Sequence, residues 1–180
     1  MQRTLVSRLV PIGRIAMAAA LLVGGNAFAG TFMGEAGFGY GSGGKISKGN
    51  DEEHGSALLL DGAFGYRFDT GFGARALFIA DVDPWRGFLA TDRSFNTFYG
   101  VQATAYVPIV EKLNLMGGLG LGQTSLNRGG FEAGHDEATD GVVSAGLQLH
   151  VVRNFSMELH VDYLIKTHVS NTALMFQVPF

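Results

Sequence analysis

Apolar and polar residues alternate along most of this chain with a period of two, which is the spacing of side chains on the two faces of a β-strand. The alternation can be followed through eight segments. They run from about residue 31 to 41, 56 to 68, 72 to 82, 95 to 107, 113 to 124, 141 to 152, 155 to 166 and 171 to 180. The segment 113–124 is the clearest, because its leucines share one face, and Asn114, Gly118, Gly120, Gly122 and Thr124 share the other. The pattern therefore predicts eight strands.

Strands of about ten residues with one apolar face are typical of transmembrane β-barrels, and eight is the smallest usual number of strands. The last segment shows the expected pattern and ends on an aromatic residue. Its apolar face carries Thr172, Leu174, Phe176, Val178 and Phe180. We therefore expect an all-β fold, an eight-stranded antiparallel up-and-down transmembrane β-barrel.

The connections between these strands alternate in length. The first three odd-numbered connections are long, at residues 42–55, 83–94 and 125–140, and the fourth, at 167–170, is short. The even-numbered connections have about two to five residues and lie at Asp69-Thr70-Gly71, at Pro108 to Lys112 and at Arg153-Asn154. Membrane barrels have short periplasmic turns and longer outer loops. The pattern predicts that the odd-numbered loops lie outside and that both termini lie in the periplasm.

The charged and histidine residues of the predicted strands lie on the face opposite the apolar one. They are Glu35, Asp61, Arg67, Arg75, Asp81, His150, Glu158, His160, Asp162 and Lys166. An eight-stranded barrel is just wide enough for its own side chains to fill. Because unpaired buried charges are costly, we expect an interior network in which Asp61, Glu35 and Glu158 pair with Arg75 and block the passage. A path for protons or small ions through these residues is the alternative.

A soluble eight-stranded barrel is the other fold to consider. It would bury the apolar face around a ligand and expose the polar face to water. The polar face is rich in glycine, which suits a tight lumen better than a solvated surface, and a soluble barrel gives no reason for the terminal Phe180. The membrane barrel is the preferred interpretation.

The first 29 residues have the features of a cleaved secretory signal peptide. Arg3, Arg8 and Arg14 precede an apolar run at residues 15–23, and Ala27-Phe28-Ala29 offers the small-x-small pattern of a cleavage site. We expect residues 1–29 to be removed and residues 30–180 to form one outer-membrane β-barrel domain of 151 residues.

Composition agrees with this assignment. The 27 glycines among 180 residues are about twice the usual share of ~7% and disfavour a helical fold. Removing three arginines from a chain of net charge −3 leaves −6, which gives no support to nucleic-acid binding. The absence of Cys excludes disulfides and thiolate chemistry.

The signal peptide, the eight alternating strands, the rhythm of the loops and the closing Phe180 together make the chain similar to the OmpA-type family of small outer-membrane β-barrels. The similarity covers residues 30–180 and is architectural. It implies insertion by the barrel-assembly machinery, for which a terminal Phe is a recognition signal. It does not settle the activity, because such barrels include structural proteins, adhesins, channels and a few enzymes. No peptidoglycan-binding domain follows the last strand, which argues against tethering to the cell wall.

His168-x-Ser170-Asn171 resembles the His-x-Ser-Asn motif of the lipid A deacylases, which share this architecture. The family needs a carboxylate after the motif to orient the histidine, and no acidic residue follows Asn171 here. We interpret the motif as a polar turn between the last two strands.

Two acidic clusters fall in the predicted outer loops, at Asp51-Glu52-Glu53-His54 and at His135-Asp136-Glu137 with Asp140. Divalent cations prefer such oxygen ligands. The spacing of a calcium loop is absent, so solvated loop acids are the preferred interpretation. Trp85 and Phe88 suit the aromatic girdle at a membrane interface.

The sequence thus predicts a monomeric protein of the outer membrane of a Gram-negative-type bacterium, with a structural or surface-interaction role and no catalysis. We expect no catalytic, cofactor-binding or metal-binding residues, and no cofactor. The expected partners are outer-membrane lipid and lipopolysaccharide, the insertion machinery during assembly, and a ligand at the outer loops. A lipid A-modifying enzyme and a narrow channel are the alternatives.

Overall fold

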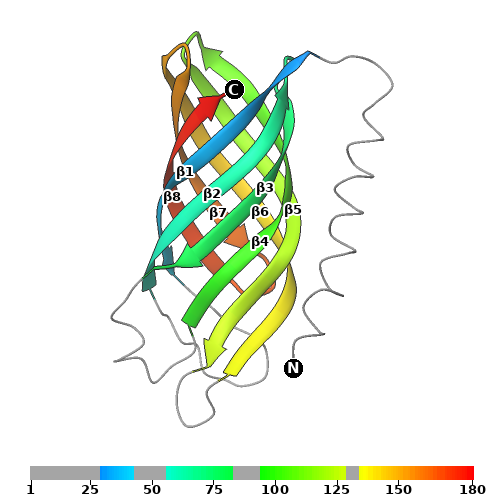
Figure 1. Ribbon diagram of the computed structural model, residues 1–180, viewed down its shortest axis with the longest axis vertical. Coiled ribbons are helices and arrows are strands. Elements are labelled where there is room, and N and C mark those ends of the chain that lie inside the picture. Colours follow the sequence, from blue (N-terminus) through cyan, green and yellow to red (C-terminus); the bar gives the residue numbers. More distant parts are fainter. Residues whose placement is uncertain (1–28, 43–55, 83–93, 129–133) are drawn as a thin grey trace.

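Eight antiparallel strands pair in sequence order, and the last pairs with the first, so that the sheet closes into a barrel (Figure 1). The computed structural model describes residues 29–42, 56–82, 94–128 and 134–180. The strands are β1 (Gly30–Ser42), β2 (Ser56–Phe68), β3 (Phe72–Asp81), β4 (Ser94–Val110), β5 (Leu113–Arg128), β6 (Gly134–Val152), β7 (Phe155–Leu164) and β8 (Val169–Pro179). The predicted all-β, eight-stranded up-and-down fold is confirmed. Among the described residues, no helix is long and apolar enough to cross a membrane.

The two ends of the barrel differ. At one end, called the turn end, three short turns join β2 to β3, β4 to β5 and β6 to β7, and the C-terminus lies beside the start of β1 (top of Figure 1). Gly71 supplies the positive φ of 84° that the first of these turns requires. At the opposite end, called the loop end, β1, β3, β5 and β7 finish. The predicted turns at 69–71 and 153–154 are confirmed, and the turn predicted at 108–112 narrows to Glu111 and Lys112.

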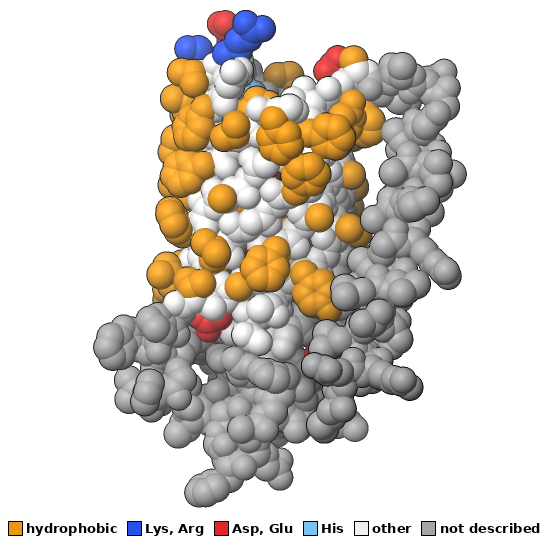
Figure 2. All heavy atoms as spheres, viewed as in Figure 1, with side chains coloured by type: hydrophobic (Ala, Val, Ile, Leu, Met, Phe, Trp, Pro, Cys, Tyr) orange, Lys and Arg blue, Asp and Glu red, His pale blue; other side chains and the backbone are white. Residues whose placement is uncertain are grey.

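The outer wall is apolar, as the alternation predicted. Leu119 is 66% exposed and Phe38 is 59% exposed, whereas the inward Ala173 and Met175 are 0% exposed. Figure 2 shows hydrophobic side chains spread over the visible wall and charged side chains at its ends. Such a band around a closed sheet is the surface that lipid tails cover in membrane barrels.

Several strand boundaries differ from the prediction. The expected loop 125–140 is largely strand, because β5 continues to Arg128 and β6 begins at Gly134. These polar residues are paired with each other in register, from Ser125 opposite Glu137 to Arg128 opposite Gly134. A strand end without an apolar face gives no alternation signal, so the sequence pattern missed it. In the other direction, β7 stops at Leu164, two residues before the predicted end.

The core lies inside the barrel and has an apolar layer at the loop end. This apolar layer consists of Leu59, Leu77, Ile79, Phe95, Phe98, Leu126, Val142, Leu164 and Val169. The most deeply buried of them, Phe98, is 0% exposed. The sequence interpretation assigned polar residues to the inner face and did not foresee this layer. The polar interior lies between the apolar layer and the turn end.

Several predictions concern residues that lie outside the described ones: residues 1–28 of the expected signal peptide 1–29, the expected loop residues 43–55 and 83–93, the acidic cluster at 51–54, Trp85 and Phe88. The predictions made for them stay predictions.

Candidate functional site

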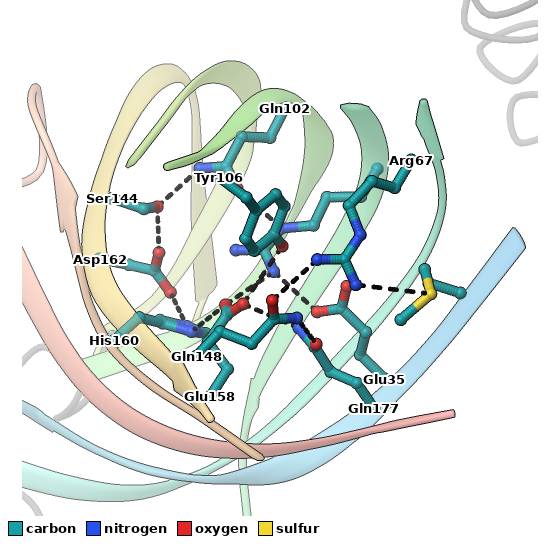
Figure 3. A network of polar contacts seen from close by, with 12 residues as sticks. Glu35, Arg67, Gln102, Tyr106, Ser144, Gln148, Glu158, His160, Asp162 and Gln177 are labelled. Carbon is teal, nitrogen blue, oxygen red and sulfur yellow. Dashed lines mark hydrogen bonds and ion pairs between the residues drawn. The ribbon is translucent and has the colours of Figure 1, made fainter. Parts of the chain in front are cut away.

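A closed ring of hydrogen bonds crosses the polar interior (Figure 3). Arg75 on β3 donates from Nε to Oε1 of Gln102 on β4 over 2.8 Å. Gln102 Nε2 donates to Ser144 Oγ on β6 over 2.6 Å. The Ser144 hydroxyl in turn donates to the carboxylate of Asp162 on β7. These four side chains link strands from β3 to β7 across the lumen.

Two more residues of β7 complete the ring. The Nε2 of His160 lies 3.0 Å from Asp162 Oδ2, and its Nδ1 lies 2.9 Å from Glu158 Oε1. Glu158 Oε1 accepts a bond of 3.2 Å from Arg75 Nη1, which closes the cycle. Residues 158, 160 and 162 face the lumen together because alternate side chains of a strand share a face.

The contacts of His160 define its charge. Each ring nitrogen faces a carboxylate oxygen, and an ionised carboxylate only accepts hydrogen bonds. A neutral imidazole has a single N–H and would leave one nitrogen lone pair against an oxygen. His160 therefore fits this position as an imidazolium that donates to Glu158 and Asp162, and it is only 1% exposed.

Glu158 accepts hydrogen bonds from four side chains while it is 0% exposed. Its Oε1 accepts from Arg75 and His160. Its Oε2 accepts from the Tyr106 hydroxyl over 3.2 Å and from Gln177 Nε2 over 2.8 Å. A carboxylate offers about four lone-pair sites, so the hydrogen-bonding capacity of Glu158 is filled.

Arg75 also forms an ion pair of 2.7 Å with Glu35, so two of the three partners predicted for it are confirmed. The third prediction is wrong, because the Asp61 carboxylate accepts instead from Asn171 Nδ2 over 2.7 Å. The register explains the difference. Asp61 lies opposite Ile79, four residues and about 13 Å along β3 from Arg75.

A second group of polar contacts lies nearer the turn end. Arg67 Nη1 donates to Gln148 Oε1 over 2.8 Å, and the Arg67 guanidinium stacks 4.4 Å from the centre of the Tyr106 ring. His150 Nδ1 lies 2.8 Å from Ser156 Oγ. The inward positions predicted for Arg67 and His150 are confirmed. Described side chains thus fill the lumen from the apolar layer to this second group of contacts near the turn end.

Two predicted inward or loop residues are placed differently. Lys166 is exposed in the turn between β7 and β8, because β7 has already ended at Leu164. Asp140 is not a solvated loop acid but points into the barrel from β6 at 1% exposure. Its carboxylate accepts from the backbone N–H of Lys166 and Thr167 over 2.7 and 3.0 Å, and from Thr167 Oγ1 over 2.6 Å. Asp140 therefore holds the β7–β8 turn. Asp81 is half-buried at the end of β3, toward the loop end.

The residues of the His-x-Ser-Asn motif do not converge. His168 is exposed and has a φ of 53°. The Tyr163 hydroxyl lies 2.7 Å from His168 Nδ1. Asn171 faces the opposite way, into the lumen. Ser170 and Asn171 belong to β8 rather than to a loop. Within the described parts of the chain, no group of three or more His, Asp or Glu is placed to hold a metal ion.

The terminal Phe180 packs on the contact between the last and first strands. Its backbone N–H donates to Phe32 O over 3.0 Å, and its ring lies 5.7 Å from that of Phe64 on β2. Gly34 makes this possible, since a Cβ there would meet the Phe180 ring at 3.0 Å. The aromatic end of the chain is thus integrated in the barrel wall.

Sequence reasoning identified most charged members of the interior but missed Ser144, Tyr106 and the apolar layer. The inward phase of the alternation already contained the signal for Ser144, which lies two residues from Val142 on β6. The same phase places Tyr106 inward, two residues from Thr104 on β4, but its residue type did not mark it as interior, because tyrosine is equally typical of the aromatic girdle of the outer wall.

Comparison with known proteins points to the same architecture. No model of a protein family matches the chain, and no curated protein matches it. Solved structures do match. The N-terminal β-barrel domain of OprF from Pseudomonas aeruginosa superposes with a TM-score of 0.59 at 15% identity, over 84% of this chain and 100% of that one. The fold is that of a small outer-membrane β-barrel.

Two further outer-membrane barrels show the same likeness. Neisserial surface protein A matches with a TM-score of 0.59 at 15% identity, over 83% of this chain and 97% of that chain. Ail, the attachment invasion locus protein of Yersinia pestis, matches with a TM-score of 0.51 at 17% identity over the same shares, in a structure with the heparin analogue sucrose octasulfate. At such identities the likeness establishes the fold, and the activity has to be argued from the barrel's own residues.

Proposed function

We propose that this protein is a closed, non-catalytic barrel of the bacterial outer membrane, with a structural role in the envelope and a contact surface at its loop end. The exposed apolar wall supports the membrane location, and the fold it shares with outer-membrane barrels supports the outer membrane in particular. Lipid and lipopolysaccharide are then its constant partners.

The packing and hydrogen bonding of the described lumen side chains are the observation that carries the proposal. The ring through Arg75 and His160 links four strands, and the apolar layer lies between it and the loop end. An ion on this path would have to break several charge-assisted hydrogen bonds and then cross packed apolar side chains, which is costly at each step. We expect a barrel whose described residues fill it in this way to resist collapse and to hold no continuous aqueous path.

The loop end supports the second part of the proposal. β4, β5 and β6 have 17, 16 and 19 residues, whereas β7 and β8 have 10 and 11. β4, β5 and β6 therefore extend beyond their neighbours on one side of the barrel. With the start of β1 and the C-terminus at the other end, long connections on the outside would place this extended sheet at the cell surface.

Planar-bilayer recording tests the closure. The purified, folded barrel should show little or no steady conductance at neutral pH. A stable and reproducible open state in the wild type would instead support the narrow channel.

Mass spectrometry of lipid A from cells with and without the gene tests for catalysis. We expect identical lipid A profiles, since His168 and Asn171 point to opposite sides of the wall. Loss or gain of an acyl chain that depends on the gene would support the lipid A-modifying enzyme.

A further inference from the structure

Two buried oxygen atoms beside Gly39 have no hydrogen-bond donor among the described residues: Asp61 Oδ2 and Asn171 Oδ1. The two side chains are 1% and 2% exposed, and they already share one bond of 2.7 Å from Asn171 Nδ2 to Asp61 Oδ1. Both free oxygens lie against Gly39 on β1, where an added Cβ would collide with each of them. They therefore face the same small space between β2 and β8.

An ionised Asp61 cannot satisfy this pair. A carboxylate has only acceptors, and the Asn171 amide has one acceptor oxygen and one donor nitrogen. Exchanging the oxygen and nitrogen of the Asn171 amide moves the unsatisfied contact without removing it. A proton on Asp61 Oδ2 supplies the missing hydrogen-bond donor, because the new O–H can donate to Asn171 Oδ1. One proton then satisfies both orphaned atoms in a cyclic acid–amide pair.

The surrounding charges favour the same state. Asp162 lies directly opposite Asn171 in the β7–β8 register and stays negative, because Ser144 and His160 both donate to it. A second negative carboxylate beside it would be repelled, and a buried charge without full hydrogen bonding is costly.

Positive groups offer Asp61 little compensation. His160, on β7, is shared between Glu158 and Asp162. Arg75, on β3, is engaged by Glu35 and Glu158. On β1, which lies between β2 and β8, the inward residues next to Asp61 are the glycines at 37 and 39, and the next inward charge is that same Glu35.

We infer that Asp61 and Asn171 form a proton-binding site, in which Asp61 is a neutral carboxylic acid at neutral pH and donates its proton to Asn171 Oδ1. The site links β2 to β8 across Gly39, next to the apolar layer on its turn-end side. An acid that is protonated in the folded barrel and ionised in the unfolded chain stabilises the fold at low pH, and this contribution is lost as the pH rises. The Asp61–Asn171 pair thus stabilises the barrel most at low pH, and its contribution to stability falls as the pH rises.

Two isosteric variants of neighbouring carboxyls test the inference in barrels folded into lipid vesicles. Asp61→Asn keeps a neutral side chain with the same pattern of donor and acceptor, so near pH 4, about where a free Asp ionises, its unfolding equilibrium constant should lie within about tenfold of the wild-type value. Asp162→Asn is the matched control. It removes an ionised acceptor from His160, and the unfolding constant should rise more than about a hundredfold. As the pH rises from about 4 to neutral, the wild type should lose stability relative to Asp61→Asn, by about tenfold in the unfolding constant per pH unit, because Asp61 then ionises only on unfolding.

Infrared spectroscopy reads the proton directly. The wild type should show a protonated-carboxyl C=O band that disappears in Asp61→Asn and remains in Asp162→Asn. If Asp61→Asn does not fold, Asn171→Leu leaves the acid in place and should shift the same band. An unchanged band in both Asp61→Asn and Asn171→Leu would overturn the inference, as would a destabilisation by Asp61→Asn equal to that by Asp162→Asn. A wild-type stability that depends on Na⁺ or K⁺, lost in Asp61→Asn, would show a bound cation in place of the proton.

Discussion

At the scale of single residues, Arg75 is a buried cation held between two carboxylates. It pairs with Glu35 at 2.7 Å and Glu158 at 3.2 Å, and its side chain is 2% exposed. Removing one partner of a buried pair leaves an uncompensated charge, so Arg75→Met should destabilise the barrel by about 3–5 kcal/mol in urea unfolding from lipid vesicles. Adding Glu35→Gln should recover part of the loss. A single variant as stable as the wild type would mean that Arg75 carries no structural charge pair.

Leu119 tests the opposite face of the wall. It is 66% exposed on the outer surface of β5, and the neighbouring Gly120 faces inward, where a Cβ would meet Val142. A cationic side chain at the midplane of a membrane barrel costs about 2–4 kcal/mol, so Leu119→Arg should lower the free energy of unfolding by that amount. Leu119→Ile, which keeps an apolar side chain, is the control. Equal stability of the Arg and Ile variants would show that Leu119 does not contact lipid.

Sequence could predict which way a residue faces but not which residue it meets across the lumen. Facing follows from the period of two, and it held for Arg75, Glu158 and Leu119. Partners depend on how far each strand is shifted against the next, which alternation does not encode. Asp61 shows the limit: it faces inward as expected, but the register places it beside Asn171 instead of Arg75.

At the scale of elements, a similar limit applies to strand ends. Boundaries set by turns were predictable, as at Phe68 and Val152, because Gly71 and the pair Arg153-Asn154 interrupt the alternation. The loop-end extension of β6 was not, since its residues from Gly134 on are held by the ladder with β5 rather than by an apolar face. Hydrogen bonding between neighbours thus defines elements where hydrophobic contrast is absent.

The closure of β8 on β1 gives a prediction at this scale. Deleting Phe180 removes the bond to Phe32 O, the ring over Gly34 and the recognition signal expected at the terminus. The folded, heat-modifiable fraction in the outer membrane should fall and periplasmic degradation should rise. Phe64→Ala separates the causes, because it removes the ring contact of 5.7 Å and leaves the terminus intact. A normal yield for the deletion would show that Phe180 is dispensable for assembly.

At the scale of the whole molecule, the described residues form a barrel with an apolar exterior and an interior that is packed at two levels. The apolar layer fills the lumen near the loop end, and on its turn-end side the ring through Glu158 and His160 pairs buried charges with one another. This arrangement lets a small sheet close on itself without an empty lumen.

The orientation of the molecule in the membrane gives the last prediction. Membrane barrels keep their short turns in the periplasm, so the loop end should face the outside. Single cysteines can be introduced without interference, because the chain has none of its own. On intact cells, Gly49→Cys in the first long connection and Gly134→Cys at the start of β6 should react with an impermeant maleimide. Thr70→Cys, in the turn between β2 and β3, should react only after the outer membrane is permeabilised. Labelling of Thr70→Cys alone on intact cells would invert the barrel and move its extended β4–β6 sheet to the periplasm.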